Sequence, residues 1–456
     1  KLTVNLGLRW EPQTVPTEVA GRISNLRRLT DTQGSVGNPY WKNTSWDEFG
    51  PRVGFAYSPF EGGRTSIRGG AGILYEPNDP NLYYTQMVRN PPLGYDYTIA
   101  VPANQQRFPD AAAQIATQNT PGPAYALPFD NMRSPHAIQY NLNVQQQLSD
   151  VDLVEIGFVG SRGINLLSVS DINMPRAVWD GISLAMPDGS TLQNPAWSSI
   201  VYYANDTSSF YNGLLTTYKR RFSSGFQGQV SFTWSKNISE TDAGQTASAV
   251  TPGGGRMKYP HDHFAQRGLS GYDFRRILTF NYSYDIPLGK NLGGVLGKIL
   301  SGWQTTGVLT IRDGQAQSVL AAVSAALTPL AVTPRSPNAT AGFDPDKIVL
   351  GGPNRYFDVA AYSAPGPRQL GNLARNTLIG PGAVAWNPAL FKKTQITERT
   401  SLEFRAEFFN LLNRPNFGIP NSTVFNGTGG AVANAGVISN TSTTSRQVQM
   451  ALKLVF

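Results

Sequence analysis

The chain has 456 residues and a net charge of +8, and only 15% of its residues are charged although 40% are hydrophobic. No run approaches the roughly 18 apolar residues that a membrane-spanning helix needs, and the absence of cysteine excludes a disulfide framework and a thiolate metal site. Scattered lysine and arginine exclude a nucleic-acid-binding stripe, and the abundant glycine, proline and aromatic residues favour short strands joined by turns.

Alternation of apolar and polar residues predicts a strand at the very start of the chain. Its apolar face consists of Leu2, Val4, Leu6, Leu8 and Trp10. The same period predicts ten more strands, at residues 53–57, 67–75, 140–148, 154–158, 211–222, 226–234, 278–286, 303–312, 385–396 and 402–408. Glycines at positions 69, 70 and 72 indicate a strand that its neighbours approach closely.

The last eleven residues also alternate and predict a twelfth strand that ends in phenylalanine. Its polar face carries Gln447, Gln449 and Lys453, and its apolar face carries Val448, Met450, Leu452, Leu454 and Phe456. Such an ending is typical of outer-membrane β-barrels, whose outer surface meets lipid and whose interior is wet. We therefore expect these five apolar residues to form a C-terminal signal for assembly into the membrane.

The connections between the predicted strands alternate strictly between long and short. The long ones cover residues 11–49, 76–135, 162–210, 237–273, 313–384 and 413–445, and 287–302 is intermediate. Outer-membrane barrels keep this parity, because their periplasmic turns are short and their extracellular loops long. The sequence thus predicts an all-β fold, an antiparallel transmembrane β-barrel of the Gram-negative outer membrane, with Phe456 at the periplasmic side.

Several sequence segments, distributed along the whole chain, resemble segments of a known family. They are Asn5-Leu-Gly-Leu-Arg-Trp10, Gly50-Pro-Arg-Val-Gly-Phe-Ala-Tyr57, Ile67-Arg-Gly-Gly-Ala-Gly-Ile73, Gln139-Tyr-Asn-Leu-Asn-Val-Gln-Gln146, Phe232-Thr-Trp-Ser-Lys236, Gly302-Trp-Gln-Thr305 and Phe404-Arg-Ala-Glu-Phe-Phe-Asn-Leu-Leu-Asn413 followed by Arg414-Pro-Asn-Phe417. In this order they resemble the C-terminal part of TonB-dependent outer-membrane receptors. The resemblance is to the Oar-like group, often found in Acidobacteria, with a carboxypeptidase-regulatory-like domain at the N-terminus.

The resemblance implies a 22-stranded barrel closed by a plug. Residues 1–456 would be the C-terminal portion of that barrel, without the plug and the N-terminal regulatory-like domain. Implied partners are outer-membrane lipid, the barrel-assembly machinery and the inner-membrane TonB energy complex, reached through the missing N-terminal part. The transported ligand would be large or scarce, such as a carbohydrate, peptide or chelate. Because the chain begins inside a strand, we expect an upstream portion before Lys1.

One cluster resembles metal ligands. His261-Asp-His263 lies in a Gly/Pro-rich segment with Asp273 nearby, and two histidines with a carboxylate suit zinc or iron. A loop rarely orients the further ligands that a metal needs, so no metal site is assigned.

Paired carboxylates occur at Glu403 and Glu407, but Arg405 lies between them on the same strand face. This pattern predicts a mixed-sign ladder that lines a hydrated lumen and, in a complete receptor, contacts the plug. No catalytic residue and no cofactor are assigned, and we do not expect an enzyme.

Basic and aromatic residues near strand ends are expected to anchor the barrel at the membrane surfaces. The run Lys219-Arg220-Arg221 is predicted at the periplasmic rim, and Trp10, Trp234, Tyr284 and Trp303 suit aromatic girdles, with core packing as the alternative. Aromatic residues of the long connections are candidates for ligand capture, namely Tyr83, Tyr84, Tyr95, Tyr97, Trp197, Tyr202 and Tyr203.

Two other classes of protein fit parts of the pattern. A self-contained barrel of twelve strands would act as a passive pore or an outer-membrane adhesin, since twelve is an even number. A soluble all-β binding protein would bury the apolar strand faces against a second sheet.

Overall fold

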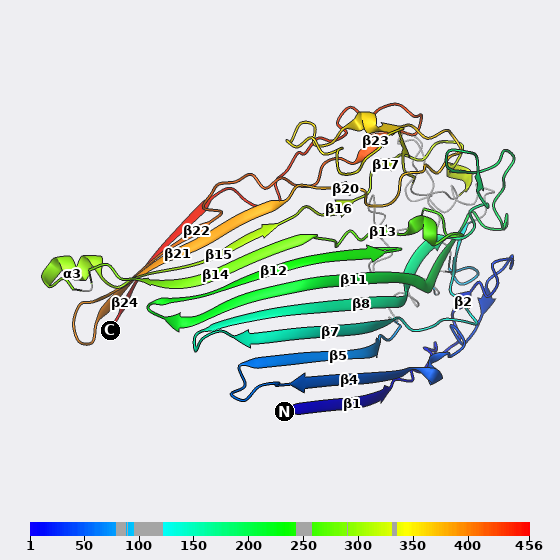
Figure 1. Cartoon of the computed structure of the whole chain (residues 1–456). Helices are drawn as coiled ribbons and strands as arrows, with labels where there is room; N and C mark the ends of the chain where they lie inside the picture. The colour runs from blue at the N-terminus through cyan, green and yellow to red at the C-terminus, as the bar shows by residue number, and fades with distance from the viewer. Residues whose placement is uncertain (79–87, 89, 95–121, 243–257, 290, 331–334) are drawn as a thin grey trace.

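The computed structural model describes residues 1–78, 88, 90–94, 122–242, 258–289, 291–330 and 335–456. Twelve strands pair antiparallel with their neighbours in one sheet, in the order β1-β4-β5-β7-β8-β11-β12-β14-β15-β21-β22-β24 (Figure 1). Their bounds are β1 Leu2–Trp10, β4 Phe49–Tyr57, β5 Thr65–Tyr75, β7 His136–Gln147, β8 Asp152–Asp171, β11 Ser199–Ser223, β12 Phe226–Ser239, β14 Arg276–Ile286, β15 Trp303–Arg312, β21 Ala383–Gln395, β22 Ser401–Phe409 and β24 Gln447–Val455. All twelve predicted strands are confirmed.

Cross-strand register puts the periodic apolar side chains that predict the strands on one face of the sheet, although a few others, such as Val159 and Phe391, lie on the opposite face. In the middle of the sheet, Ile156 of β8 lies opposite Thr216 of β11, which lies opposite Phe232 of β12, which lies opposite Leu278 of β14. This face stays exposed and meets no second sheet in the part of the chain that the structure describes. The soluble two-sheet alternative is therefore wrong.

Glycines on the apolar face accept aromatic rings from the neighbouring strand. Gly69 lies opposite Phe55, and a Cβ on Gly69 would stand 2.7 Å from the Phe55 ring. Gly160 lies opposite Tyr140, whose ring would come within 2.1 Å of a Cβ at that position. Only glycine leaves room for these rings, which cover the strand backbone where it has no side chain of its own. The predicted close approach at Gly69 is confirmed.

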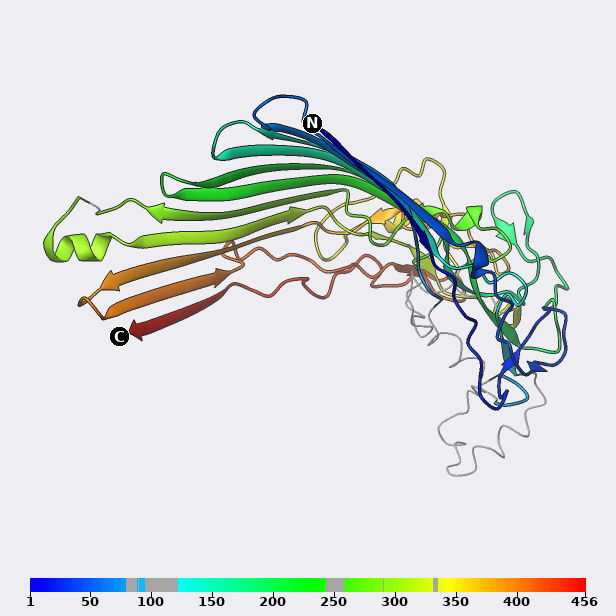
Figure 2. The ribbon, with the colours of Figure 1, turned by 90° about the horizontal axis from the view of Figure 1, so that it is seen from below.

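The two ends of the sheet differ, as the parity of the connections predicts. Residues 58–64, 148–151, 224–225 and 396–400 form short turns at one end, the periplasmic end. In the tightest of them Ser224 and Gly225 both have positive φ, 53° and 81°, the geometry of a type I′ hairpin turn. The described residues of the long connections gather at the other, extracellular end (Figure 2).

Two neighbouring strands continue beyond the height that a bilayer requires. A tilted strand crosses the membrane in about 9–11 residues, whereas β8 has 20 residues and β11 has 25. Their extra length is buried rather than exposed, and it includes Val169, Val201 and Tyr203. This hairpin therefore connects the membrane-spanning part of the sheet to the long connections at the extracellular end.

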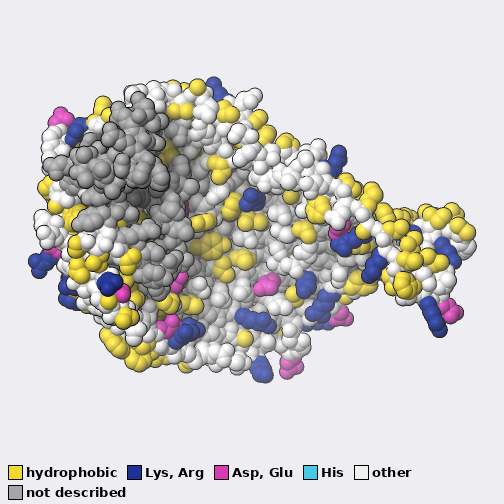
Figure 3. Space-filling model, turned by 180° about the vertical axis from the view of Figure 1, so that it is seen from behind, with side chains coloured by type: hydrophobic (Ala, Val, Ile, Leu, Met, Phe, Trp, Pro, Cys, Tyr) yellow, Lys and Arg dark blue, Asp and Glu magenta, His cyan; other side chains and the backbone are white. Residues whose placement is uncertain are grey.

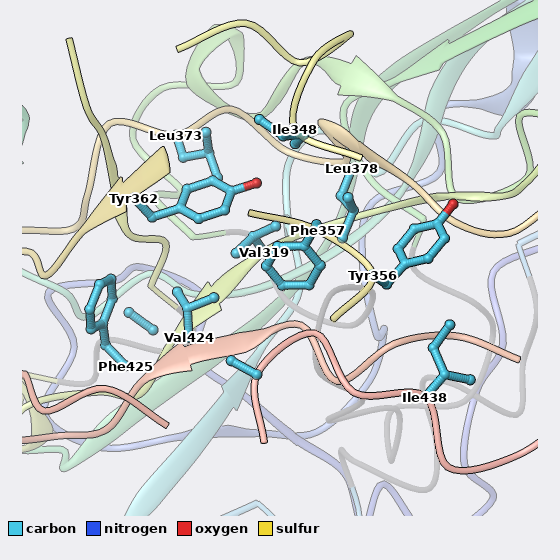
Figure 4. Packing of buried hydrophobic residues seen from close by; sticks show 12 residues of the cluster. Val319, Ile348, Tyr356, Phe357, Tyr362, Leu373, Leu378, Val424, Phe425 and Ile438 are labelled. Atoms are coloured by element: carbon cyan, nitrogen blue, oxygen red, sulfur yellow. The ribbon is translucent and has the colours of Figure 1, made fainter. Parts of the chain in front are cut away.

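The long connections pack together into a layer that we call the extracellular layer. It contains the four hydrophobic clusters found in the described residues, and Figure 4 shows the largest, around Phe357. Its short elements are β2 Ser24–Asn25, β3 Ser35–Val36, η1 Ser45–Asp47, β6 Pro123–Ala126, β9 Val178–Trp179, β10 Leu184–Ala185, η3 Phe264–Gln266, β13 Gly268–Leu269, β16 Ala316–Gln317, β17 Leu320–Ala321, η4 Thr328–Leu330, β18 Asn338–Ala339, η5 Val359–Ala361, β19 Tyr362–Ser363, β20 Leu378–Ile379 and β23 Thr423–Phe425. The hydrophobic core of this chain thus lies outside the membrane.

One helix occurs at the periplasmic end, where the sequence predicts only a connection of intermediate length. It is α3 Gly294–Leu300, between β14 and β15. No helix in the described segments has the length and apolar content to cross a bilayer.

The sheet remains open at its two edges. Among the strands that the structure describes, β1 pairs only with β4 and β24 pairs only with β22, so these two strands lie at opposite ends of the pairing order. Figure 2 shows the curved sheet with the two chain ends at its opposite margins. Each edge presents unpaired backbone groups.

Candidate functional site

The inner face of the sheet is lined by uncharged polar side chains. It presents, among others, Gln139, Asn141, Asn143, Gln145, Gln227, Gln229, Asn281 and Thr306. Figure 3 shows the molecule from behind, with Lys, Arg, Asp and Glu side chains scattered over a mostly white surface of polar side chains and backbone. Amides and hydroxyls accept and donate hydrogen bonds without a fixed charge, so this surface suits a hydrated lumen.

A charged ladder occupies the periplasmic end of the same face, on the last three strands. Glu403 of β22 lies between Lys393 of β21 and Lys453 of β24, and its carboxylate is 3.2 Å from the Lys393 Nζ. Arg405 pairs with Glu407, and the Arg405 Cζ is 4.9 Å from the centre of the Phe391 ring. Each carboxylate has a basic partner, so the predicted mixed-sign ladder is confirmed.

The ladder borders an open groove of about 700 Å³ that extends from Asp285 of β14 to Lys453 of β24. Positive and negative groups alternate along it, so a ligand or protein segment that lies here meets both signs of charge. A flat, uncharged surface would not provide this complementarity.

The predicted basic run lies where the sequence places it, next to the periplasmic turn after β11. Arg220 is 3.1 Å from Asp152 at the start of β8, and the Tyr218 hydroxyl donates a 2.7 Å hydrogen bond to the same carboxylate. These contacts fasten the periplasmic ends of two neighbouring strands.

Aromatic residues form two levels on the outer face. At the extracellular level, Trp10 stacks on Phe49 with ring centres 6.1 Å apart, and Trp234 is 56% exposed. At the periplasmic level, Tyr284 contacts Phe226, and Trp303 contacts Phe404 and Lys392. Outward-facing rings at both ends of the strands match two interfacial girdles rather than a protein core.

A family model described as an outer membrane beta barrel domain matches residues 1–449. The chain belongs to this outer-membrane β-barrel family. It is therefore a protein of the Gram-negative outer membrane, its apolar face meets lipid, and its polar face is the lumen wall. No curated protein matches the sequence.

Solved outer-membrane proteins resemble the fold of this family member only distantly. The outer membrane transporter YddB from Escherichia coli has 11% identity and a TM-score of 0.48, with 90% of this chain and 40% of that chain covered. A mutant ferric enterobactin receptor from Pseudomonas aeruginosa has 10% identity and a TM-score of 0.42 with the same coverage. The copper transporter OprC has 10% identity and a TM-score of 0.38, with 92% and 43% covered. The chain spans about two fifths of the length of these proteins.

The two histidines of the candidate metal cluster face different partners in this barrel protein. The His261 Nε2 is 2.9 Å from the Met174 carbonyl oxygen and 2.9 Å from the Gln193 amide nitrogen, and burial lowers the pKa of His261. The His263 Nε2 is 3.6 Å from Asp206. Asp273 instead accepts a hydrogen bond from the Asn237 backbone amide. The described residues contain no group of three metal-binding side chains, and both histidines belong to the packed extracellular layer.

Three candidate ligand-capturing aromatics of the barrel contribute to packing. Trp197 is buried, and its Nε1 donates a 2.9 Å hydrogen bond to the Asp31 carbonyl oxygen. Tyr203 lies in one hydrophobic cluster and Tyr202 packs against another, the one that contains Trp197, and both tyrosines are on β11 rather than in a loop. Tyr83, Tyr84, Tyr95 and Tyr97 fall outside the described residues.

Two basic residues inside the extracellular layer could not be identified from the sequence. Arg335 is 1% exposed and donates hydrogen bonds to the carbonyl oxygens of Ala322 and Gly366. The Lys258 Nζ donates to the Ser336 hydroxyl at 2.9 Å and to the Gly371 carbonyl oxygen at 3.2 Å. Backbone carbonyl groups that accept hydrogen bonds from a buried lysine or arginine leave no recognisable pattern in a single sequence.

Burial lowers the pKa of Lys258 from 10.5 to about 8. Between these two pH values the unfolded chain binds more protons than the folded chain, so the stability of the extracellular layer should rise with pH, by up to about 3 kcal/mol. We expect the layer to become more resistant to limited proteolysis from pH 8 to pH 10. Lys258→Met should abolish this rise, whereas Lys347→Met, at an exposed lysine of the same layer, should keep it. An unchanged pH profile in Lys258→Met would contradict the assignment.

Proposed function

We propose that this chain is the C-terminal part of the barrel of a TonB-dependent outer-membrane receptor of the Oar-like group. The whole of residues 1–456 would be barrel, and the plug and the N-terminal regulatory-like domain would belong to the rest of the receptor. The receptor would move a large or scarce ligand, such as a carbohydrate, peptide or chelate, inward or outward. An inner-membrane TonB complex would supply the energy, and no covalent chemistry is part of this function.

The observation that carries the proposal is the open sheet with a polar, charged inner face. Its edge strands β1 and β24 have free backbone groups, and they lie at opposite ends of the pairing order. Further strands that continue from β1 would satisfy these groups and enlarge the lumen to the size that a plug requires. A passive pore of twelve strands would instead need direct pairing between β1 and β24.

Engineered cysteine pairs distinguish these two barrels, because the chain has no cysteine of its own. Asn5→Cys on β1 would be combined in turn with Gln447→Cys, Gln449→Cys and Lys453→Cys on β24. The control pair, Asn5→Cys with Gly54→Cys, joins residues that lie opposite each other on β1 and β4. A short thiol cross-linker would be applied to the outer-membrane protein as made from its gene.

We expect the control pair to cross-link and the three β1–β24 pairs not to do so. Efficient cross-linking of any β1–β24 pair would show that the twelve strands close on themselves, which would refute the proposed receptor barrel. In that case conductance of the chain alone in a planar bilayer would identify a passive pore.

The C-terminal strand is proposed to carry the signal for the barrel-assembly machinery. Met450, Leu452 and Phe456 are 69%, 67% and 93% exposed, and the free edge of β24 is available for pairing. We expect Phe456→Ala to lower the amount of folded barrel in the outer membrane several-fold, because the exposed aromatic ring is lost. Lys453→Ala, on the inner face of the same strand, should change this amount little. Heat-modifiable migration of membrane fractions on gels would measure both, and equal amounts in the two variants would exclude this role.

A further inference from the structure

The periplasmic end of the sheet has one connection that differs from the others. Residues 287–302 join β14 to β15 and contain the helix α3, whereas the other connections at this end are short turns. In Figures 1 and 2 the helix protrudes beyond the strand ends. A tight turn would be enough to join these two strands, so the longer connection with its helix indicates an additional role.

The surface of this connection is strongly apolar. Its exposed apolar side chains are Leu288, Leu292, Val295, Leu296, Ile299 and Leu300, with exposed fractions from 37% for Leu300 to 74% for Val295. Figure 3 shows hydrophobic side chains gathered over this protruding tip. Inside the connection, Gly297 is buried, and a Cβ there would stand 1.9 Å from the Leu292 carbonyl oxygen. The backbone therefore packs on itself and turns its large apolar side chains outward, where water would solvate them poorly.

Contacts at the base of α3 attach it to the lipid-facing side of the sheet. The Trp303 Nε1 donates a 3.0 Å hydrogen bond to the Ile299 carbonyl oxygen. The Lys392 Nζ donates to the Lys298 carbonyl oxygen at 2.9 Å and lies 5.0 Å from the centre of the Trp303 ring. Trp303 belongs to the periplasmic aromatic girdle on the outer face. The apolar surface of α3 is thus continuous with the surface that meets lipid.

We propose that α3 lies in the periplasmic leaflet of the outer membrane as an interfacial anchor. Its leucine, valine and isoleucine side chains enter the boundary between acyl chains and headgroups, and the exposed Lys298 lies at the level of the lipid phosphates. The partner is glycerophospholipid with an anionic headgroup, which matches both the apolar surface and the positive charge. Contact with this leaflet holds the β14–β15 hairpin at a fixed depth.

Depth-dependent fluorescence quenching tests this assignment. Leu296→Cys in the full chain would be labelled with an environment-sensitive fluorophore and reconstituted into vesicles of phosphatidylethanolamine and phosphatidylglycerol. Glu398→Cys, in the exposed turn of the neighbouring β21–β22 hairpin, is the matched control. Heat-modifiable migration would first establish that both labelled proteins are folded. Spin-labelled lipids would then report contact with the bilayer, and iodide would report contact with water.

We expect spin-labelled lipid to quench the label at position 296 several-fold more strongly than the label at 398, and most strongly with the spin group near the headgroups. Iodide should show the reverse order. Strong iodide quenching at position 296 would show a solvated tip, and weak quenching by both agents would show that protein covers it. Either result would overturn the proposal. In a second measurement, Lys298→Glu should reduce the lipid quenching at position 296 in phosphatidylglycerol vesicles, and unchanged quenching would refute the role of the charge.

Discussion

Replacing Leu142 with arginine is expected to destabilise the membrane sheet by about 2–4 kcal/mol. Leu142 lies in the middle of β7, opposite Gly69 and Phe158, and its side chain points to the lipid. A guanidinium at this level loses its hydration and has no carboxylate beside it on the apolar face. The loss of stability therefore comes from the position of the charge and not from the loss of leucine packing.

The matched control is Asn141→Arg, on the preceding residue of the same strand. Asn141 faces the lumen, opposite Gly70 and Val159, where water can solvate the new charge. We expect its free energy of unfolding from lipid vesicles in urea to stay within about 0.5 kcal/mol of the parent value. An equal loss of unfolding free energy in the two variants would mean that water is excluded from both faces of β7 to the same degree. That result would contradict the assignment of the outer face and the lumen.

The membrane part of the fold follows from the sequence because the bilayer imposes a simple rule on it. Each strand must alternate between lipid and water, so a period of two reveals it, and residues 303–312 match β15 at both ends. The parity of the connections separates the two ends of the barrel for a similar reason. Side chains of the inner face, such as Glu403 and Arg405, are then assigned by counting along the strand.

The extracellular layer could not be predicted in this way, because no period governs packing between loops. Arg335 is charged and Gly/Pro-rich segments surround it in the sequence, yet it is buried at 1% exposure. The extra length of β8 and β11 could not be predicted for the same reason. Above the membrane their residues pack against the connections, so the alternation that marks a strand in lipid disappears. The helix α3 was missed because seven residues give too short a pattern to read.

We expect a second large effect in the extracellular layer, at the centre of its largest hydrophobic cluster. Phe357 is fully buried and lies 6.0 Å from the Tyr362 ring, centre to centre. Its cluster joins the connection between β15 and β21 to the connection between β22 and β24, which supplies Val424 and Ile438 (Figure 4). Phe357→Ala should leave a cavity and destabilise the layer by about 3–5 kcal/mol. The strands should keep their stability, because this core lies outside the membrane.

Hydrogen exchange followed by mass spectrometry would locate the loss. We expect faster exchange in peptides from both connections, residues 313–382 and 410–446, and unchanged exchange in β14 and β15. Phe60→Ala is the control, since Phe60 is 68% exposed in a periplasmic turn and should affect neither region. If Phe357→Ala changed exchange only next to residue 357, the two connections would be independent loops. Faster exchange in both would show that they unfold together, as one folded layer above the lumen.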